Sequence, residues 1–202
     1  VVVRIGKIGL LMLAGLAIGL GSRTFAAADE IGLPSDALPV TTVRASQAGA
    51  RLDTNLLKGG GTDDTEALQR LLDRAKDGHG VHVIIDGPAL VHGLDIYGNT
   101  TLEFTPGAGL YLRDHSDRAL IRNAHRSRGA VVDSHITILG GFLNGNRDGQ
   151  QLKLPGRAVN QEADGTFKTV LQLFGVNYIT IRNVTIWDSR SFGLWIANAK
   201  HI

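Results

Sequence analysis

The residues best suited to contact a ligand lie in the last third of the chain. Strand-like runs there place Trp187 and Trp195 on the outward side, where an indole ring can stack on a sugar. Arginines stand near them, and a guanidinium group can bind a carboxylate through two parallel hydrogen bonds. We therefore predict a binding surface suited to an acidic oligosaccharide, made of Arg147, Asp148, Trp187, Asp188, Arg190 and Trp195.

Each of these residues also has a plain structural explanation. Trp187 precedes Asp188 at an expected corner of the chain and could pack beneath a loop. Arg147 and Arg190 are related by an offset of 43 residues, which would place them on one side of the molecule about two repeats apart, but arginines there could serve only solubility. The segment 147–168 has mixed charge, so it is either a wall of a binding site or a solvated loop.

Other catalytic chemistries find little support in the sequence. The 202 residues include no cysteine, which excludes a thiol nucleophile and a cysteine-ligated metal. The seven histidines show no metal-binding spacing. The adjacent acids Asp63 and Asp64 stand at a predicted helix start, where capping accounts for them. We expect no metal and no cofactor, since only Asp148 and Asp188 are loosely placed for a calcium ion.

The first 28 residues are typical of a signal peptide. Arg4 and Lys7 precede the apolar stretch 8–21, and the alanines 26–28 follow it. Cleavage after Ala28 removes three basic residues and no acid, which takes the formal net charge from +2 to −1. Nucleic-acid binding then loses its electrostatic support, and no later segment is long enough to span a membrane. We expect a secreted or periplasmic protein.

An extended arm and a helix are predicted next. Residues 29–58 show no sustained period, which indicates an extended arm or an edge strand. The glycines 59–61 then lead into an amphipathic helix over 63–76, with Asp63 as its cap, Glu66 in its first turn and Gly78 at its end.

Short repeating strands fill the rest of the chain. From Val81 onward, apolar-alternating runs are separated by Gly, Asn or Asp, with no helix between them. Residues 171–179 recur as 194–202 at an offset of 23, and residues 136–143 recur as 179–186 at an offset of 43, close to two such units. A repeat of this length made of strands indicates a parallel β-helix, whose coils stack at the spacing of paired strands, about 4.8 Å.

Corners and ends of the coils can also be predicted. Asn99, Asn123 and Asn183 each follow an alternating run, where asparagine can adopt the left-handed conformation that a sharp corner needs. The helix is placed to cover the first coil. The strand register continues up to Ile202, so we expect a truncated piece of a longer β-helix.

Three stretches of sequence resemble a known superfamily. They are GGGTDDTEALQ at 59–69, VHVIIDGPALVHGLDIYGNTTLEF at 81–104 and GGFLNGNRDGQ at 140–150. Together they are similar to the pectate-lyase-like superfamily, in particular its polygalacturonase- and rhamnogalacturonase-related glycoside hydrolases. The resemblance implies an all-β fold, a single-stranded right-handed parallel β-helix with an N-terminal amphipathic capping helix. Two departures are Asn144, where polygalacturonases commonly have aspartate, and the long segment 147–168.

The resemblance also implies a function. It suggests an exported, polygalacturonase-like glycoside hydrolase whose partner is an acidic, pectin-like polysaccharide. In such enzymes the catalytic carboxylates lie on later coils, within N-x-D, aspartate-pair, G-H-G and R-x-K motifs, so we expect them beyond Ile202. Two alternatives remain open. One is a polysaccharide lyase of the same fold, which would need Ca2+, and the other is a non-catalytic glycan-binding β-helix.

Overall fold

The computed structural model describes residues 40–202, so the predicted signal peptide and the first part of the predicted arm lie outside the described residues. Strands are the main regular structure of the described chain, beside one short α-helix and a few 3-10 turns, which confirms the all-β prediction. The strands are β1 (Val40–Arg44), β2 (Gly80–Ile85), β3 (Pro88–Val91), β4 (Leu94–Ile96), β5 (Thr100–Phe104), β6 (Gly109–Leu112), β7 (Ile121–Asn123), β8 (Asp133–Leu139), β9 (Phe142–Asn144), β10 (Leu171–Phe174), β11 (Val176–Arg182), β12 (Thr185–Trp187) and β13 (Leu194–Ala197).

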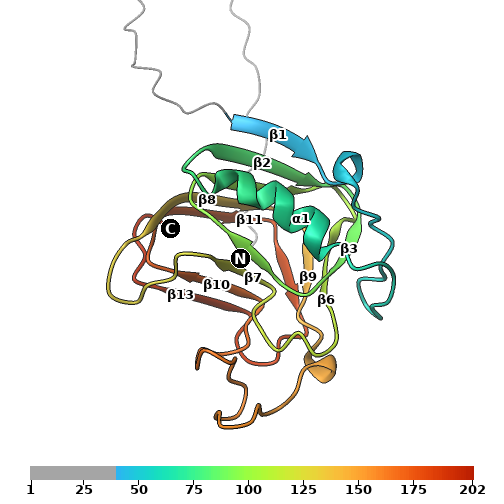
Figure 1. Ribbon diagram of the computed structural model, residues 1–202, viewed down its shortest axis with the longest axis vertical. Coiled ribbons are helices and arrows are strands. Elements are labelled where there is room, and N and C mark those ends of the chain that lie inside the picture. The colour runs from blue at the N-terminus through green and yellow to red at the C-terminus, as the bar shows by residue number, and fades with distance from the viewer. Residues whose placement is uncertain (1–39) are drawn as a thin grey trace, which may run out of the picture. The chain divides into compact units, whose positions relative to one another are not determined.

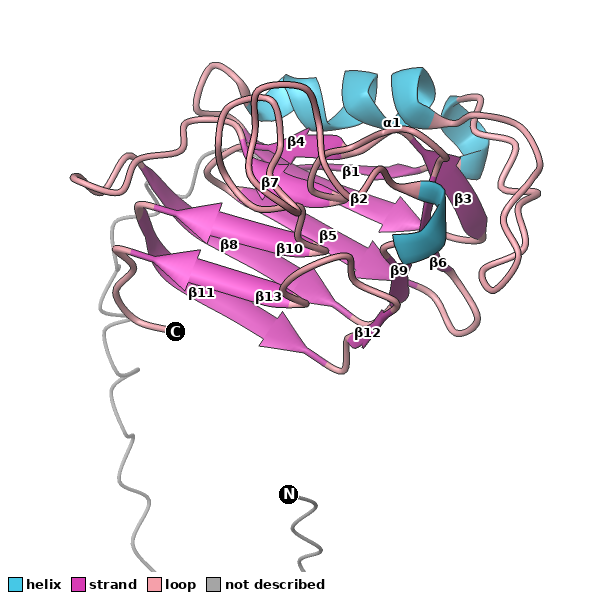
Figure 2. Cartoon of the chain, turned by 90° about the horizontal axis from the view of Figure 1, so that it is seen from below, coloured by secondary structure: helices cyan, strands magenta, loops and turns pink. Residues whose placement is uncertain are grey.

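The strands form three parallel sheets that run along the molecule (Figure 2). We call them sheet 1 (β1-β2-β5-β8-β11), sheet 2 (β3-β6-β9-β12) and sheet 3 (β4-β7-β10-β13). From β2 onward the chain visits the three sheets in turn, and each new coil adds one parallel strand to each sheet. The result is the coiled stack of strands that the repeats predict, while its right-handed sense stays a prediction.

Strand pairing confirms both repeats and corrects the meaning of one. Leu171 pairs with Leu194 at the offset of 23, and Ile136 pairs with Ile179 at the offset of 43. Both offsets therefore relate neighbouring coils, and the prediction that 43 residues span two coils is wrong. The longer coil differs only because the connection from β9 to β10, residues 145–170, is long.

The inward side chains stack in columns between the sheets. Val83 pairs with Leu102, Leu102 with Ile138, and Ile138 with Ile181. The first three are fully buried, and Ile181 is partly buried. Burying one such side chain contributes about 1.5–3 kcal/mol, so these columns hold successive coils together.

The predicted helix forms, and it covers the first coil (Figure 1). α1 spans Thr65–Leu72 and continues as a 3-10 turn, Asp73–Ala75. Leu68, Leu71 and Leu72 are buried, and α1 packs against β2 and β4. Within residues 40–202, no helix has the length and apolar character needed to cross a membrane.

The helix is shorter at its start than predicted because the two acids before it have other partners. The carboxylate of Asp64 accepts the N–H groups of Arg51 and Leu52 at 2.6 and 2.9 Å, so it fixes the arm. Asp63 accepts the N–H of Thr65 at 2.9 Å and pairs with Arg113 at 2.6 Å. The N-cap residue is Asp64 and not Asp63 as predicted, and its side chain makes no capping hydrogen bond. Both acids are structural, but through these other contacts.

Left-handed residues turn the chain at its corners. Asn99 and Asn183 have φ of 58° and 56°, as predicted. Asn123 does not, because it ends β7 fully buried and its amide exchanges hydrogen bonds with the backbone of Phe174. Near the starts of β8 and β11, His135 and Tyr178 are also left-handed, and their rings stack with centroids 4.8 Å apart.

Candidate functional site

The outward face of sheet 3 carries one row of polar and aromatic side chains. Its strands are paired in register, so the second residue of each strand points to the same side. Asp95 pairs with Arg122, Arg122 with Gln172, and Gln172 with Trp195. We call these four residues the polar row. Neighbours such as Leu94 are fully buried, because alternate residues of a strand face the core.

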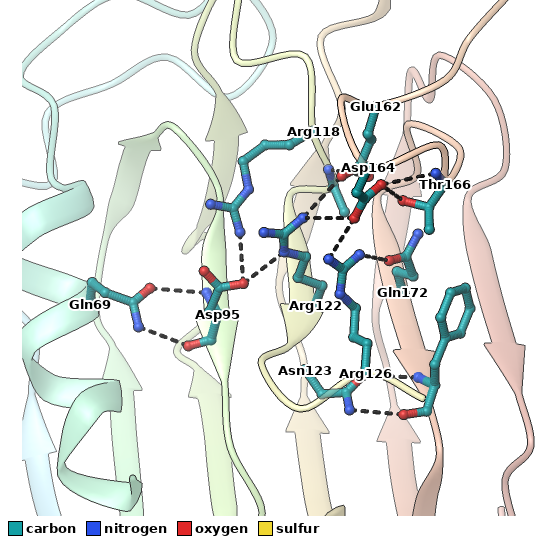
Figure 3. A network of polar contacts seen from close by, with 12 residues as sticks. Gln69, Asp95, Arg118, Arg122, Asn123, Arg126, Glu162, Asp164, Thr166 and Gln172 are labelled. Carbon is teal, nitrogen blue, oxygen red and sulfur yellow. Dashed lines mark hydrogen bonds and ion pairs between the residues drawn. The ribbon is translucent and has the colours of Figure 1, made fainter. Parts of the chain in front are cut away.

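Asp95 is held at the first end of the polar row. Arg118 and Arg122 donate to its Oδ1 at 2.8 and 2.7 Å (Figure 3). Gln69 of the covering helix donates to the carbonyl oxygen of Asp95 and accepts its N–H, both at 2.9 Å. Burial opposes ionisation of this carboxyl, but its hydrogen bond with Arg122 and the two positive charges outweigh that effect and lower its pKa. The backbone of Asp95 therefore joins the helix to sheet 3, and its ionised carboxylate holds Arg118 and Arg122.

The long connection 145–170 brings Glu162 onto the same face. Its Oε1 accepts the N–H of Ala119 at 2.9 Å, and its Oε2 accepts Arg122 at 3.0 Å. The side chain is only 3% exposed. Burial raises the pKa of Glu162, since the nearby positive charge of Arg122 offsets the desolvation only in part.

Asp164 lies two residues further along the same connection, and its pKa is lowered where that of Glu162 is raised. Its Oδ1 accepts the N–H and hydroxyl of Thr166 at 2.9 and 2.6 Å. Its Oδ2 accepts Arg126 at 2.6 Å, and Arg126 also donates to Gln172 at 2.6 Å. Burial opposes ionisation here too, but the hydrogen bonds of Thr166 and Arg126 lower the pKa of Asp164 to about 2.

The network of Glu162, Asp164 and their arginines holds parts of the chain in place, and it is poorly arranged for proton transfer to a substrate. One carboxyl with a raised pKa and one with a lowered pKa is the combination that glycosidases use. Both oxygens of Glu162, however, already accept hydrogen bonds inside the protein, and the side chain is buried. The network therefore attaches the connection 145–170 to sheet 3 and fixes the outward arginines.

Aromatic rings surround Trp195 at the other end of the polar row. Ring centroids of Phe174, Phe167 and Phe192 lie 4.8, 5.6 and 5.7 Å from the indole. The guanidinium carbon of Arg128 lies 4.6 Å from its centroid, within the range of a cation–π contact. Trp195 is thus part of an aromatic cluster on the outward side of sheet 3.

The corner after sheet 2 brings together four of the six predicted binding residues, which we call the corner cluster: Arg147, Asp148, Trp187 and Asp188. The N–H of Arg147 donates to the carbonyl oxygen of Asp188 at 3.0 Å and to its Oδ2 at 3.1 Å. Arg147 Nε lies 3.4 Å from Asp148 and 3.6 Å from Asp188. Trp187 is 55% exposed, and the side chain of Arg147 is 54% exposed. An open indole and an open guanidinium therefore share one corner.

Arg190 lies apart from this cluster. Its Nε is buried and has no hydrogen-bond partner among residues 40–202, and it lines a small void together with Lys168. Since residues 144 and 187 are paired on neighbouring coils, the predicted spacing of Arg147 and Arg190 by two coils is wrong. The prediction that both arginines face an acidic oligosaccharide requires two exposed guanidinium groups. Only that of Arg147 is exposed.

The segment 147–168 is not simply a solvated loop. Asp148, Lys153 and Arg157 are exposed, but Lys168 is 1% exposed. Its ammonium group donates to Asp117 at 2.7 Å and to the carbonyl oxygen of Gln151 at 2.5 Å. With Glu162, this buried charge anchors both ends of the segment to the coils.

Three triplets that sequence reasoning passed over spell motifs of the resembled enzymes. Residues 146–148 read N-x-D, 74–76 read R-x-K and 78–80 read G-H-G. The structure places 146–148 at the corner after sheet 2 and the other two around the end of the covering helix, next to β2. They therefore lie at different corners of the coils and form no common site.

No group of three or more His, Cys, Asp or Glu side chains within residues 40–202 is arranged to hold a metal ion. A hollow of about 590 Å³ lies where sheet 1 turns into sheet 2, lined by residues such as Leu56, Phe104 and Phe142. Its lining contains no titratable side chain. The hollow therefore adds no acid or base to the polar row or the corner cluster.

The backbone is similar to those of several solved structures. No family model and no curated protein sequence matches. A putative glycosyl hydrolase from Parabacteroides merdae is 16% identical over 79% of this chain and 74% of its own, with a TM-score of 0.55. A family 28 exopolygalacturonase from Yersinia enterocolitica is 16% identical over 81% of this chain and 37% of its own, with a TM-score of 0.58. The adhesin PfbA of Streptococcus pneumoniae is 21% identical over 80% of this chain and 42% of its own, with a TM-score of 0.49.

The likenesses to the glycosyl hydrolase and the exopolygalacturonase establish the fold. The chain has the coiled parallel-strand fold of polygalacturonase-like proteins, which confirms the predicted resemblance at the level of structure. The chain spans little more than a third of the length of the exopolygalacturonase.

Proposed function

We propose that this protein is an exported glycoside hydrolase of the polygalacturonase type, built on a right-handed parallel β-helix, and that it binds an acidic polysaccharide. The described coils supply the binding surface in this proposal. The likeness in backbone to a glycosyl hydrolase and an exopolygalacturonase supports the class of enzyme. Export rests on the N-terminal sequence pattern, and it predicts a mature protein that begins at Asp29.

The observation that carries the proposal is the corner cluster. Trp187 offers an open aromatic face for a sugar ring. Asp188 holds the backbone of Arg147 beside it, so the guanidinium can meet a uronate carboxylate next to that ring. Arg122 of the polar row and three arginines near it, Arg118, Arg126 and Arg128, add to this charge, because these four guanidinium groups outnumber the three carboxyl groups of Asp95, Glu162 and Asp164 on sheet 3.

Binding of oligogalacturonate by the full chain tests this surface. We expect Trp187→Ala and Arg147→Ala each to weaken binding about tenfold in calorimetry, because each removes a principal contact. Arg157→Ala is the matched control, since Arg157 is an exposed arginine on the same connection. Equal affinity of all four proteins, or no binding by any of them, would overturn the assignment.

The reaction is tested by its products with the full gene product. Hydrolysis creates new reducing ends without ultraviolet absorbance and persists when calcium is chelated. A calcium-dependent lyase would instead yield an unsaturated uronide that absorbs in the ultraviolet, and a chelator would abolish its activity. Binding without either product would identify a glycan-binding β-helix.

A further inference from the structure

A second hollow, of about 430 Å³, lies at the corner where sheet 3 turns into sheet 1. Its walls come from the end of the covering helix, from the corner of the first coil, and from residues 131–134 and 177 of later coils. The volume is in the range of small-molecule sites, about 300–1,000 Å³. None of the residues predicted from the sequence to bind a ligand lines it.

A buried carboxylate fixes one histidine in this hollow. Asp133 is 5% exposed, and it accepts hydrogen bonds from Asn123 at 2.9 Å and from the N–H of Gly98 at 3.3 Å. Its Oδ1 also lies 3.1 Å from Nδ1 of His125. That contact sets the orientation of the ring, and His125 Nε2 has no hydrogen-bond partner among the described residues. The imidazole can therefore offer Nε2 to a ligand.

An unsatisfied acceptor lies in the same lining. The side-chain oxygen of Asn177 is buried and has no hydrogen-bond partner within residues 40–202. A buried acceptor without a partner is costly, so a ligand that donates an O–H or N–H to it gains stability. Val131 and Val132 line the hollow as well, and they are 42% and 45% exposed. They provide an apolar wall beside the polar groups.

The charges in the hollow argue against an anionic ligand. Lys76 is the ammonium group of the lining, and it already pairs with Asp73 at 2.9 Å. Asp73 also accepts the hydroxyl of Tyr97 at 3.3 Å. With Asp133 next to His125, an added carboxylate would meet existing negative charge. A neutral ligand with hydroxyl groups and one apolar face fits these walls best.

We propose that the hollow beside His125 is a second carbohydrate site, which binds a neutral pyranose unit. The hydroxyl groups of the sugar bond to His125 Nε2 and to the side-chain oxygen of Asn177, and its apolar face packs on Val131 and Val132. The site is separate from the corner cluster and uses no residue of it.

Nuclear magnetic resonance with the full chain tests this site. Methyl galactoside, methyl rhamnoside and methyl xyloside are titrated while the imidazole signals of the histidines are followed. We expect at least one glycoside to shift the signals of His125 and to leave those of the exposed His115 unchanged. A galactan oligomer then distinguishes a free sugar from a unit within a chain, because a site for a chain binds the oligomer more tightly.

Substitutions separate a binding role from a structural one. His125→Ala and Asn177→Leu should each weaken glycoside binding about tenfold, because each removes one polar contact. His115→Gln is the matched control and should bind normally. Asn177→Leu should also leave thermal stability unchanged or raised, because it removes an unsatisfied acceptor.

The binding results expected for the hollow beside His125 differ from those expected for the corner cluster. Trp187→Ala should bind the glycosides normally, so this proposal can stand if the proposed function fails, and the reverse also holds. The proposal is overturned if no neutral glycoside shifts the signals of His125, if only galacturonic acid does so, or if binding survives both His125→Ala and Asn177→Leu.

Discussion

Lys168 and Asp117 form a buried ion pair that the stability of the long connection depends on. Replacing Lys168 by Met removes the ammonium and leaves a carboxylate that is 8% exposed without its cation. Because one partner of a buried pair is lost, we expect the free energy of unfolding to fall by about 3–5 kcal/mol. Denaturant unfolding measures this value.

A second change isolates the unpaired charge as the cause. Lys168→Met combined with Asp117→Asn should recover much of the loss, because the amide is neutral and asparagine tolerates the φ of 53° at this position. Lys153→Met, at an exposed lysine, should have little effect. A double variant as unstable as the single one would show that packing, and not charge, dominates.

The lowered pKa of Asp164 leads to a prediction of how the stability of the protein depends on pH. Its pKa falls from an ordinary 3.8 to about 2 in the folded protein. A lowered pKa contributes stability that is present above pH 4 and is lost as the pH falls toward 2. Asp164→Asn should therefore flatten the fall of the melting temperature between pH 4 and pH 2. Asp148→Asn, at a side chain that is 84% exposed, should follow the wild type, and identical profiles for all three proteins would contradict the prediction.

At the residue scale, the sequence predicted exposed side chains such as Trp187 and Arg147, and of the polar row it predicted only Trp195. Trp187 and Arg147 stand out because an exposed aromatic or cation next to a corner is visible in the pattern. Asp95, Arg122 and Gln172 do not, because connections of different length separate them by 27 and 50 residues along the chain. Only the step from Gln172 to Trp195 keeps the repeat of 23. The pairing of residues across a sheet cannot be predicted from a sequence repeat when the connections between strands vary in length.

Among the elements, α1 shows how the first coil is closed. Leu72 is fully buried against the coils, whereas Arg70 and Glu66 form an exposed pair at 2.8 Å. Leu72→Ala should lower the free energy of unfolding by about 2–5 kcal/mol, because it leaves a cavity beneath the helix. Arg70→Ala should cost at most about 0.5 kcal/mol. Chemical denaturation compares the two, and similar losses would mean that the helix does not act as an apolar cover.

The helix and the strands could be predicted because their patterns are local. An amphipathic stripe and short alternating runs follow from periodicity alone. The exact start of the helix could not, since it depends on Asp64 binding Arg51 and Leu52, which lie more than ten residues earlier. Left-handed residues were predicted at Asn99 and Asn183 but not at His135 or Tyr178, near the starts of β8 and β11, where ring stacking accompanies the unusual backbone.

For the whole molecule, the stacked coils predict a gradient of local stability. β5 pairs on both sides, and its inward Leu102 is fully buried, whereas Ile186 and Ile196 on the final described coil are only partly buried. Because each coil rests only on its neighbours, backbone amides of β5 should exchange more slowly than those of β12 and β13. Hydrogen–deuterium exchange followed by mass spectrometry measures this order. Equal protection throughout would indicate that the coils unfold as one unit.

The long connection between β9 and β10 shows that the length of a connection does not change how the strands of neighbouring coils pair. Residues 145–170 leave the solenoid after sheet 2 and return so that Leu171 still pairs with Ile121 of the coil below. The corner from sheet 1 to sheet 2 stays short on every described coil, at 86–87, 105–108, 140–141 and 183–184. The short corner from sheet 1 to sheet 2 thus keeps successive coils in register, while the connection after sheet 2 can vary in length and hold an insertion. The exposed stretch around Lys153 and Arg157 is therefore a natural graft point, where a foreign peptide could be displayed without disturbing the coils on either side.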